Sequence, residues 1–352
     1  MIQTIYLAGG CFWGAQHFLR QIRGVSKTVV GFANGDTPDP TYKQVYTDTT
    51  GYSECVKVSF DDGVLPLELL LQLYFTSIDP LSLNHQGEDF GTRYRTGIYY
   101  TPDTERAFLP VIRSVYDSVL RNLSFKTGKK VESLEVEVLP LRNFYSAEEF
   151  HQDYLINNPT GYCHLGPAAF RRAREANSDA YFLRPAEERD LPDAWRMLHE
   201  AAQRMMSEGK TQWNENYPNP EAVRSDIQKG CGYVLCQRTG DNPDGTPLVY
   251  GAAILSGEKA YHPLLEGEWK TEEPYVVVHR IASEMSRQNS GLAGRFLREV
   301  ASMSRERGCR SFRIDTNYDN ERMISLLYSL GFTYCGKCVY PQGGRLCFEK
   351  AL

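Results

Sequence analysis

A polar, basic segment at residues 166–180, GPAAFRRAREANSDA, shows no strand or helix pattern and divides the 352-residue chain near its middle. A single hydrophobic core rarely grows beyond about 250–300 residues. A chain of this length with a break at this point is therefore expected to fold as two domains. We expect the first domain at residues 1–170, a linker at 171–180 and the second domain at 181–352.

The composition indicates a globular protein, because 41% of the residues are hydrophobic and 24% are charged. The net charge is −5 and the Lys and Arg residues are scattered, which disfavours a nucleic-acid or membrane-surface role. No apolar run approaches the roughly 20 residues of a membrane span, and the N-terminus lacks the pattern of a signal peptide. Nine cysteines without a compact spacing favour a reducing compartment, so a cytoplasmic location is expected.

Strand and helix patterns alternate through both halves of the chain. In the first half, strands are expected at residues 2–7, 25–32, 55–60, 97–100 and 134–139, and helices at 13–20, 65–75, 104–120 and 147–155. In the second half, strands are expected at 181–183, 232–236, 248–255, 275–282, 311–315, 333–340 and 345–349, and helices at 191–206, 292–305 and 321–330.

Cys11 lies where an expected strand and two glycines lead into an expected helix. The first N–H groups of a helix are unpaired and carry partial positive charge. We therefore expect this position to stabilise a thiolate, to lower the pKa of Cys11 and to raise its reactivity. A buried structural role is common for a cysteine, so position alone does not decide between the two.

Residues 10–14, GCFWG, resemble the motif of the A-type methionine sulfoxide reductases, which are peptide-methionine (S)-S-oxide reductases. Four further segments resemble the same family in the same order: 34–42 (NGDTPDPTY), 50–54 (TGYSE), 86–95 (QGEDFGTRYR) and 151–163 (HQDYLINNPTGYC). The resemblance covers about residues 5–166. It implies a two-layer α/β domain with a mixed sheet that reduces methionine sulfoxide, free or protein-bound.

The resemblance implies a catalytic role for five residues. Cys11 attacks the sulfoxide sulfur and becomes a sulfenic acid. Glu54, with the hydroxyls of Tyr42 and Tyr94, supplies and positions the proton that the leaving oxygen needs, and burial of the carboxyl suits it to act as an acid. Asp89 orients the site.

The resemblance also implies how the substrate is held and how the enzyme is recycled. Phe12 and Trp13 form the wall against the substrate methyl group. Cys163 attacks the sulfenic acid to form a disulfide, which thioredoxin reduces. No further cysteine follows before the expected linker ends, so a single resolving cysteine is expected, with no cofactor and no metal. Gln16 and Glu88 depart from the residues that many relatives carry.

An alternative reading treats the first domain as a cysteine hydrolase or acyltransferase. The GCFWG turn would then present a nucleophile that needs a histidine base. His17, His85 and His151 are the candidates for that base.

In the second half, residues 288–294 (QNSGLAG) lie between an expected strand and an expected helix. Small residues at such a turn let backbone N–H groups approach a diphosphate, and the helix N-terminus adds a favourable field. The turn resembles the pyrophosphate loop of the GNAT acetyltransferases, which implies acetyl-CoA binding by Gln288, Asn289, Ser290, Gly291, Leu292, Ala293 and Gly294.

Residues 319–332, DNERMISLLYSLGF, resemble a second GNAT segment and imply a mixed sheet flanked by helices over residues 181–352. Asn320 is then expected at the CoA site. Tyr328 either protonates the CoA sulfur or packs on the sheet, and His279 and Glu284 are either bases or structural residues. The domain could instead be a non-catalytic CoA-binding or scaffolding module.

Cys335 and Cys338 form a C-x-x-C pattern, which occurs in zinc and redox sites. No second pair stands at zinc-finger spacing. Residues three apart in a strand face opposite sides, so a structural role is expected for both.

Overall fold

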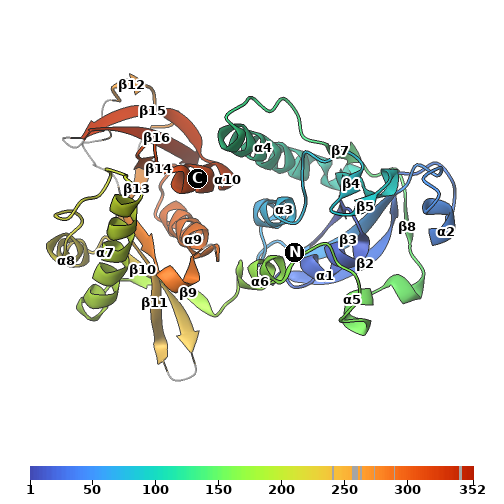
Figure 1. The fold of residues 1–352 in the computed structure, drawn as a ribbon, viewed down its shortest axis with the longest axis horizontal. Coiled ribbons are helices and arrows are strands. Elements are labelled where there is room, and N and C mark those ends of the chain that lie inside the picture. Colours follow the sequence, from blue (N-terminus) through green and yellow to red (C-terminus); the bar gives the residue numbers. More distant parts are fainter. Residues whose placement is uncertain (240–241, 256–260, 262–263, 273, 289, 341–342) are drawn as a thin grey trace. The chain divides into compact units, whose positions relative to one another are not determined.

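The computed structural model describes residues 1–239, 242–255, 261, 264–272, 274–288, 290–340 and 343–352. The chain forms two compact units, Met1–Asn177 and Ser178–Leu352 (Figure 1). Every helix within the described ranges is too short or too polar to span a bilayer.

The first unit is built on a six-stranded sheet with the order β7-β6-β1-β3-β2-β8. The β6–β7 pair is parallel and the other pairs are antiparallel, so the sheet is mixed, as predicted. Its strands are β1 (Ile2–Gly9), β2 (Val25–Ala33), β3 (Ser53–Asp61), β6 (Thr96–Tyr100), β7 (Val136–Pro140) and β8 (Phe144–Ser146). A separate two-stranded hairpin comprises β4 (His85–Gln86) and β5 (Asp89–Phe90).

Helices cover one face of this sheet and form the second layer (Figure 1). Alternating side chains of β1 divide between two clusters. Ile5 and Leu7 join the main core beneath the helices, whereas Tyr6 and Ala8 join a smaller cluster on the other face. The helices are α1 (Phe12–Leu19), α2 (Tyr42–Val45), α3 (Leu67–Phe75), α4 (Pro102–Thr127), α5 (Tyr154–Asn157) and α6 (Pro167–Glu175), with short 3-10 turns η1 (Thr92–Tyr94) and η2 (Glu149–His151).

The register of the sheet brings the start of α1 to a carboxyl group. Leu7 of β1 pairs with Val56 of β3. Because the strands are antiparallel, Glu54 lies beside the end of β1, where the chain enters the turn that carries Cys11.

Helix α6 corrects the expectation that residues 166–180 have no helix pattern. Ala173 is fully buried in the core of the first unit, and Phe170 packs against the same core. The ring of Phe170 also meets the ring of His17 on α1 edge-on at 4.9 Å. Two apolar side chains three residues apart lie on one face of a helix and are enough to pack a short helix against the core. The four charged residues of α6 make this apolar face hard to recognise in the sequence.

The helix predicted at residues 147–155 is wrong, because the segment holds only the 3-10 turn η2 and the start of α5. Gln152 bonds the backbone N–H and C=O of Val30 through its amide, each at 3.0 Å. Asp153 takes a left-handed conformation, and its N–H donates to Gln16 at 2.9 Å. Contacts with distant residues therefore override the local helical pattern.

The second unit contains an eight-stranded sheet with the order β12-β15-β16-β14-β13-β11-β10-β9. Only the β13–β14 pair is parallel among the described pairs, so this sheet is also mixed, as predicted. The strands are β9 (Tyr181–Pro185), β10 (Gly232–Thr239), β11 (Asn242–Leu255), β12 (Glu266–Gly267), β13 (Tyr275–Ser283), β14 (Ser311–Thr316), β15 (Thr333–Tyr340) and β16 (Gly343–Ala351).

Helices flank both faces of the second sheet (Figure 1). Tyr250 of β11 joins the cluster under α7, whereas the next residue, Gly251, lies against the ring of Phe296 on α9. The helices are α7 (Leu191–Ser207), α8 (Pro220–Gln228), α9 (Leu292–Glu306) and α10 (Glu321–Ser329), with 3-10 turns η3 (Glu188–Asp190) and η5 (Met285–Arg287). The pattern analysis missed α8, whose sequence is mostly polar.

Candidate functional site

Cys11 occupies the N-cap position of α1 and is 7% exposed. The backbone N–H groups of Trp13 and Gly14 interact with its sulfur and favour the thiolate. Burial and the nearby carboxyl of Glu54 have the larger effect, and together they raise the pKa of Cys11 well above its ordinary value. The expectation of a lowered pKa is therefore wrong, because burial outweighs the field at the helix start.

Glu54 is a fully buried carboxyl beside Cys11. Its Oε2 accepts a hydrogen bond from the backbone N–H of Phe12 at 2.9 Å, whereas Oε1 has no hydrogen-bond partner among the described residues. Burial raises the pKa of Glu54 to about 8, although the Phe12 N–H and the Arg93 guanidinium oppose this rise. Glu54 is consequently protonated near neutral pH and holds a proton next to the thiol.

Tyr42 and Tyr94 contribute two phenols to the same neighbourhood. Burial, followed by the charge of Glu54, raises the pKa of both hydroxyls. Both phenols therefore remain protonated and can act as hydrogen-bond donors. Arg93, paired with Asp48 at 2.5 Å, places its guanidinium 4.4 Å from the ring centre of Tyr94.

Aromatic rings line up along the start of α1. The ring of Phe12 lies 6.3 Å from that of Tyr42 and 5.4 Å from that of His151. Trp13 stacks on Tyr154 at 3.9 Å, and its indole N–H donates to Nδ1 of His151 at 3.2 Å. The predicted methyl wall thus belongs to one continuous aromatic cluster.

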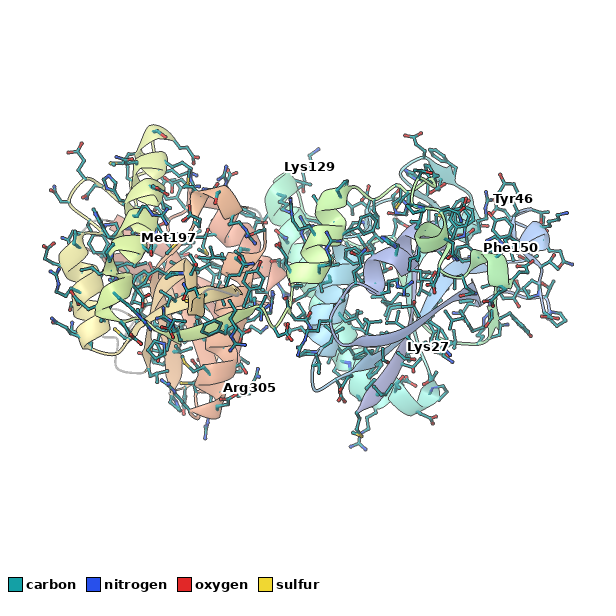
Figure 2. The ribbon with its side chains drawn as sticks, turned by 90° about the horizontal axis from the view of Figure 1, so that it is seen from below. Lys27, Tyr46, Lys129, Phe150, Met197 and Arg305 are labelled. Atoms are coloured by element: carbon teal, nitrogen blue, oxygen red, sulfur yellow. The ribbon has the colours of Figure 1, made fainter. Side chains whose placement is uncertain are left out.

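The cluster extends outward to exposed rings. Tyr46 lies 6.0 Å from Tyr42, and Phe150 lies 4.1 Å from His151. Both are more than half exposed, and Figure 2 shows them at the same end of the first unit.

Cys163 lies over the first turn of α1. A Cβ placed on Gly14 would lie 3.1 Å from the Cys163 sulfur, so the absence of a side chain at Gly14 gives the second thiol its place. Both Cys11 and Cys163 are free thiols in this structure. Asp89 accepts a hydrogen bond from the Tyr162 hydroxyl at 3.2 Å and lies 3.8 Å from Nδ1 of His164.

The three histidines considered as a hydrolase base have other contacts. His151 accepts the Trp13 indole N–H, and His85 bonds Ser82 and stacks on Phe90. His17 meets Phe170. The histidine that does lie against the turn is His164, which the sequence reasoning did not select although it follows Cys163 directly.

A family model described as "Peptide methionine sulfoxide reductase" matches residues 3–181, just over half of the chain. The chain belongs to the peptide methionine sulfoxide reductase family. The reductase MsrA of Lachnoclostridium phytofermentans is 47% identical over 176 residues, which are 50% of this chain and 100% of that protein. The MsrA of Clostridium acetobutylicum is 46% identical over 47% of this chain and 95% of its own length. The first unit is accordingly an oxidoreductase of this family.

The chain also shows likeness to solved structures. A methionine sulfoxide reductase A of Corynebacterium diphtheriae has 35% identity and a TM-score of 0.43, covering 46% of this chain and 77% of that one. A GNAT-family acetyltransferase of Streptococcus agalactiae has 29% identity and a TM-score of 0.44, covering 49% of this chain and 96% of that one.

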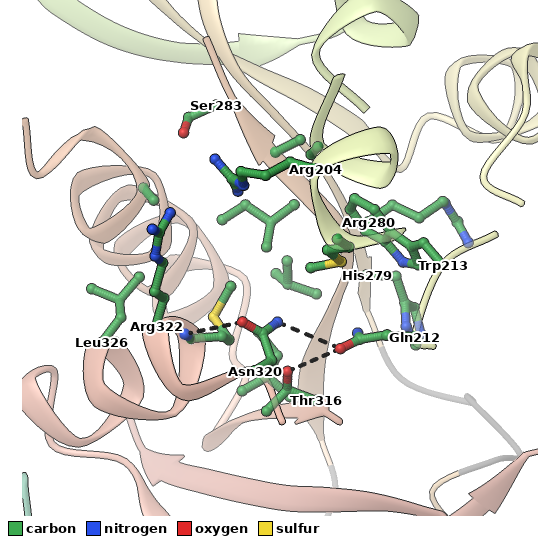
Figure 3. A pocket seen from close by; sticks show the side chains of 18 of the residues that line it. Arg204, Gln212, Trp213, His279, Arg280, Ser283, Thr316, Asn320, Arg322 and Leu326 are labelled. Carbon is green, nitrogen blue, oxygen red and sulfur yellow. Dashed lines mark hydrogen bonds between the residues drawn. The ribbon is translucent and has the colours of Figure 1, made fainter. Parts of the chain in front are cut away.

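Outside the reductase unit, the second unit contains a cavity of about 550 Å³. It opens where β13 and β14 part, because the two strands pair only as far as Val277 and Arg313. Beyond that point, residues of both strands line the cavity. On its wall, Gln212 Oε1 accepts from Thr316 Oγ1 at 3.3 Å and from Asn320 Nδ2 at 3.4 Å (Figure 3).

The predicted turn lines this cavity. Its lining includes Gln288, Ser290, Gly291, Leu292, Ala293 and Gly294, together with Asn320; Asn289 lies outside the described residues. Gly291 caps α9 at φ 84°, a left-handed conformation that favours glycine. Tyr328 is not part of the lining and instead packs edge-on against Phe348 at 5.5 Å.

The cavity wall is rich in cations. Arg204 from α7 and Arg322 from α10 face the same space (Figure 3), and burial together with the charge of Arg322 lowers the pKa of Arg204. Lys210, Arg280, Arg287 and Arg345 complete this set. His279 also lines the cavity, whereas Glu284 is paired with Arg196 at 2.6 Å.

The C-x-x-C residues Cys335 and Cys338 both lie in β15 and are buried. Within the described ranges, no group of three or more His, Cys, Asp or Glu side chains is arranged to hold a metal. The thiol of Cys335 contacts Thr333 O and Glu349, which agrees with a structural role.

Proposed function

We propose that the first unit reduces methionine S-sulfoxide to methionine, with Cys11 as the nucleophile and Glu54 as the acid. One observation carries this proposal. A carboxyl that is neutral near pH 7 lies beside the Cys11 thiol at a helix start, with its Oε1 unpaired. An unpaired buried polar atom is costly, and a sulfoxide oxygen would give it a partner.

In the first step, the Cys11 sulfur bonds to the sulfoxide sulfur while Glu54 protonates the sulfoxide oxygen. The bond between the two sulfurs and the sulfur–oxygen bond of the substrate then break, the hydroxyl transfers to the Cys11 sulfur to give a sulfenic acid, and methionine leaves. The thiol proton of Cys11 balances the proton that Glu54 gives up. The high pKa of Cys11 suits this order, because thiol and carboxyl exchange protons within the site.

The phenols and the aromatic cluster bind the substrate in this proposal. The hydroxyls of Tyr42 and Tyr94 donate to the oxygen as it gains negative charge. Phe12 and Trp13 hold the methyl group, since thioether sulfur and methyl groups pack well against rings. A fixed methyl position selects one sulfur stereochemistry. Asp89 and its neighbours complete the polar side of the site.

Recycling uses the second thiol. Cys163, placed over Gly14, attacks the Cys11 sulfenic acid, forms a disulfide and releases water. An external dithiol of the thioredoxin type then reduces the disulfide by exchange.

The test compares the purified chain on separate S- and R-sulfoxides of a blocked methionine, with dithiothreitol as the reductant. Methionine is expected from the S form only, and Cys11→Ser is expected to yield none, because an alcohol is a far weaker nucleophile. Equal turnover of the R form, or activity in Cys11→Ser, would refute the assignment of the site.

For the second unit, we propose acetyl-CoA binding in the cavity between β13 and β14. The separation of the two strands beyond Val277 and Arg313 supports this proposal, because it leaves a cavity of about 550 Å³ for the ligand. The backbone of the turn before α9, a 15-residue helix, is suited to a diphosphate. The cation-rich wall supports the same ligand, since its lining holds six Lys or Arg side chains against two carboxylates, Glu208 and Asp315. Acyl transfer to an acceptor is the activity that this ligand serves.

Calorimetric titration of the full chain with acetyl-CoA tests this part. We expect one binding event, competed by CoA and weakened by added salt because the phosphates meet several cations. Absence of heat at millimolar acetyl-CoA would favour a scaffolding role for the second unit. Binding without transfer to any amine would favour a non-catalytic CoA-binding module.

A further inference from the structure

His164 is a buried imidazole that lies against the glycine turn of the reductase unit. Its side chain is 7% exposed. A Cβ on Gly14 would lie 3.4 Å from its Cε1 and 3.5 Å from its Nδ1, and a Cβ on Gly87 would lie 3.2 Å from its Cβ. The ring therefore closes over the turn that carries Cys11.

Neither ring nitrogen of His164 has a hydrogen-bond partner among the described residues. Buried polar groups are almost always paired, and one nitrogen of a neutral imidazole is a donor and the other an acceptor. The carboxylate of Asp89 lies nearby, with Oδ2 at 3.8 Å from Nδ1. A buried imidazole in this state has both a proton to give and a lone pair to accept one.

Gly14 lies close to His164 and to both thiols. The backbone N–H of Gly14 interacts with the Cys11 sulfur. Around the same residue, the Cys163 sulfur and Nδ1 of His164 lie 3.1 and 3.5 Å from the position of a Gly14 Cβ. The nucleophile, the resolving thiol and the imidazole therefore surround one residue.

The disulfide-forming step requires two proton movements. The Cys163 thiol is half-buried, and burial raises its pKa, so its proton must be removed as the sulfur attacks. The hydroxyl of the Cys11 sulfenic acid must gain a proton to leave as water. Glu54 lies near Cys11, but no described contact joins it to Cys163.

We propose that His164 carries the proton from the Cys163 thiol to the hydroxyl that leaves Cys11. The S–H bond of Cys163 and the S–O bond of the sulfenic acid break, and the S–S bond and an O–H bond of water form. The sulfenic acid is the oxidant, and no other reactant is required. This role rests on the proposed function of the first unit, and it deepens that function at its second step.

The experiment follows a single turnover of the full chain on a methionine S-sulfoxide without reductant. Methionine release reports the first step, and loss of free thiols reports disulfide formation. In His164→Gln, we expect methionine release within about twofold of wild type and disulfide formation at least 10-fold slower, since proton transfer by a side chain typically contributes 10²–10⁴-fold. A sulfenic acid trapped by dimedone should accumulate.

The matched control is His85→Gln, a histidine of the same unit that bonds Ser82 outside the turn; both steps should stay at the wild-type rate. In His164→Gly, added imidazole should restore disulfide formation, which a merely structural role would not do. Wild-type disulfide formation in His164→Gln would overturn the proposal, and so would equal slowing of both steps. If the wild-type chain releases no methionine, the proposed function fails instead.

Discussion

Replacing Glu54 with Gln separates the stability of the reductase unit from its chemistry. The carboxyl has an ordinary pKa of 4.5, which burial raises to about 8. When folding raises the pKa of a carboxyl, that group destabilises the folded state once the pH exceeds its ordinary pKa. The destabilisation stops growing once the pH exceeds the pKa in the folded state. Below pH 4.5 the penalty is absent.

The size of the effect follows from these two values. Each pH unit between them costs about 1.4 kcal/mol. From pH 5 to pH 7.5, wild type should therefore lose about 3 kcal/mol of stability relative to Glu54→Gln, which has no charge to bury. Glu54 is 1% exposed, so solvent screening does not reduce this figure. The unpaired amide of Gln carries a penalty of its own, but that penalty does not vary with pH.

Scanning calorimetry of the full chain at pH 5 and pH 7.5 measures the difference. For a unit of this size, 3 kcal/mol corresponds to a shift of about 6–12 °C in the transition of the first unit. In the same variant, single-turnover methionine release should fall by about 10²–10⁴-fold, because Gln cannot donate the proton. If the stabilities of wild type and Glu54→Gln change equally between pH 5 and pH 7.5, Glu54 is ionised in the folded state and cannot serve as the acid.

Three further changes address the other parts of the mechanism. Cys163→Ala should release about one methionine per site in a burst and then stop when thioredoxin is the reductant; continued turnover would identify another resolving thiol. Gly14→Ala places a Cβ 3.1 Å from the Cys163 sulfur, so disulfide formation should slow more than methionine release. If the substitution slows both steps equally, Cys163 relocates freely. Gly291→Val meets no atom within 4 Å but must hold φ 84°, so it should abolish acetyl-CoA binding in titrations while sulfoxide reduction is unchanged; retained binding would place the diphosphate elsewhere.

Most of the strands and longer helices could be predicted because their signals are local. Period-two and period-3.6 patterns placed β1, α1, β13 and α9 close to their observed bounds. The short helix α6 and the interrupted segment before α5 were not predicted, since both depend on contacts with distant residues. Gln152 bonds β2, 122 positions away in the sequence.

The electrostatics of the site could not be predicted from position. Placement at a helix start indicates a lower pKa for Cys11, but the depth of burial and the approach of Glu54 depend on the whole sheet. The cations of the second cavity are scattered along the sequence and meet only in the fold. Tyr328 stands at a motif position, yet its ring packs on Phe348.

The segment that carries Cys163 is held at both ends by the helix that begins at Cys11. Before it, Tyr154 stacks on Trp13; after it, Phe170 meets His17. Short flexible tethers already give effective concentrations in the millimolar range, and anchoring at two points confines this thiol further. In the proposed mechanism, disulfide closure takes place within one turn of helix, and the tethered sulfur is expected to outcompete free thiols and further oxidant molecules for the oxidised cysteine.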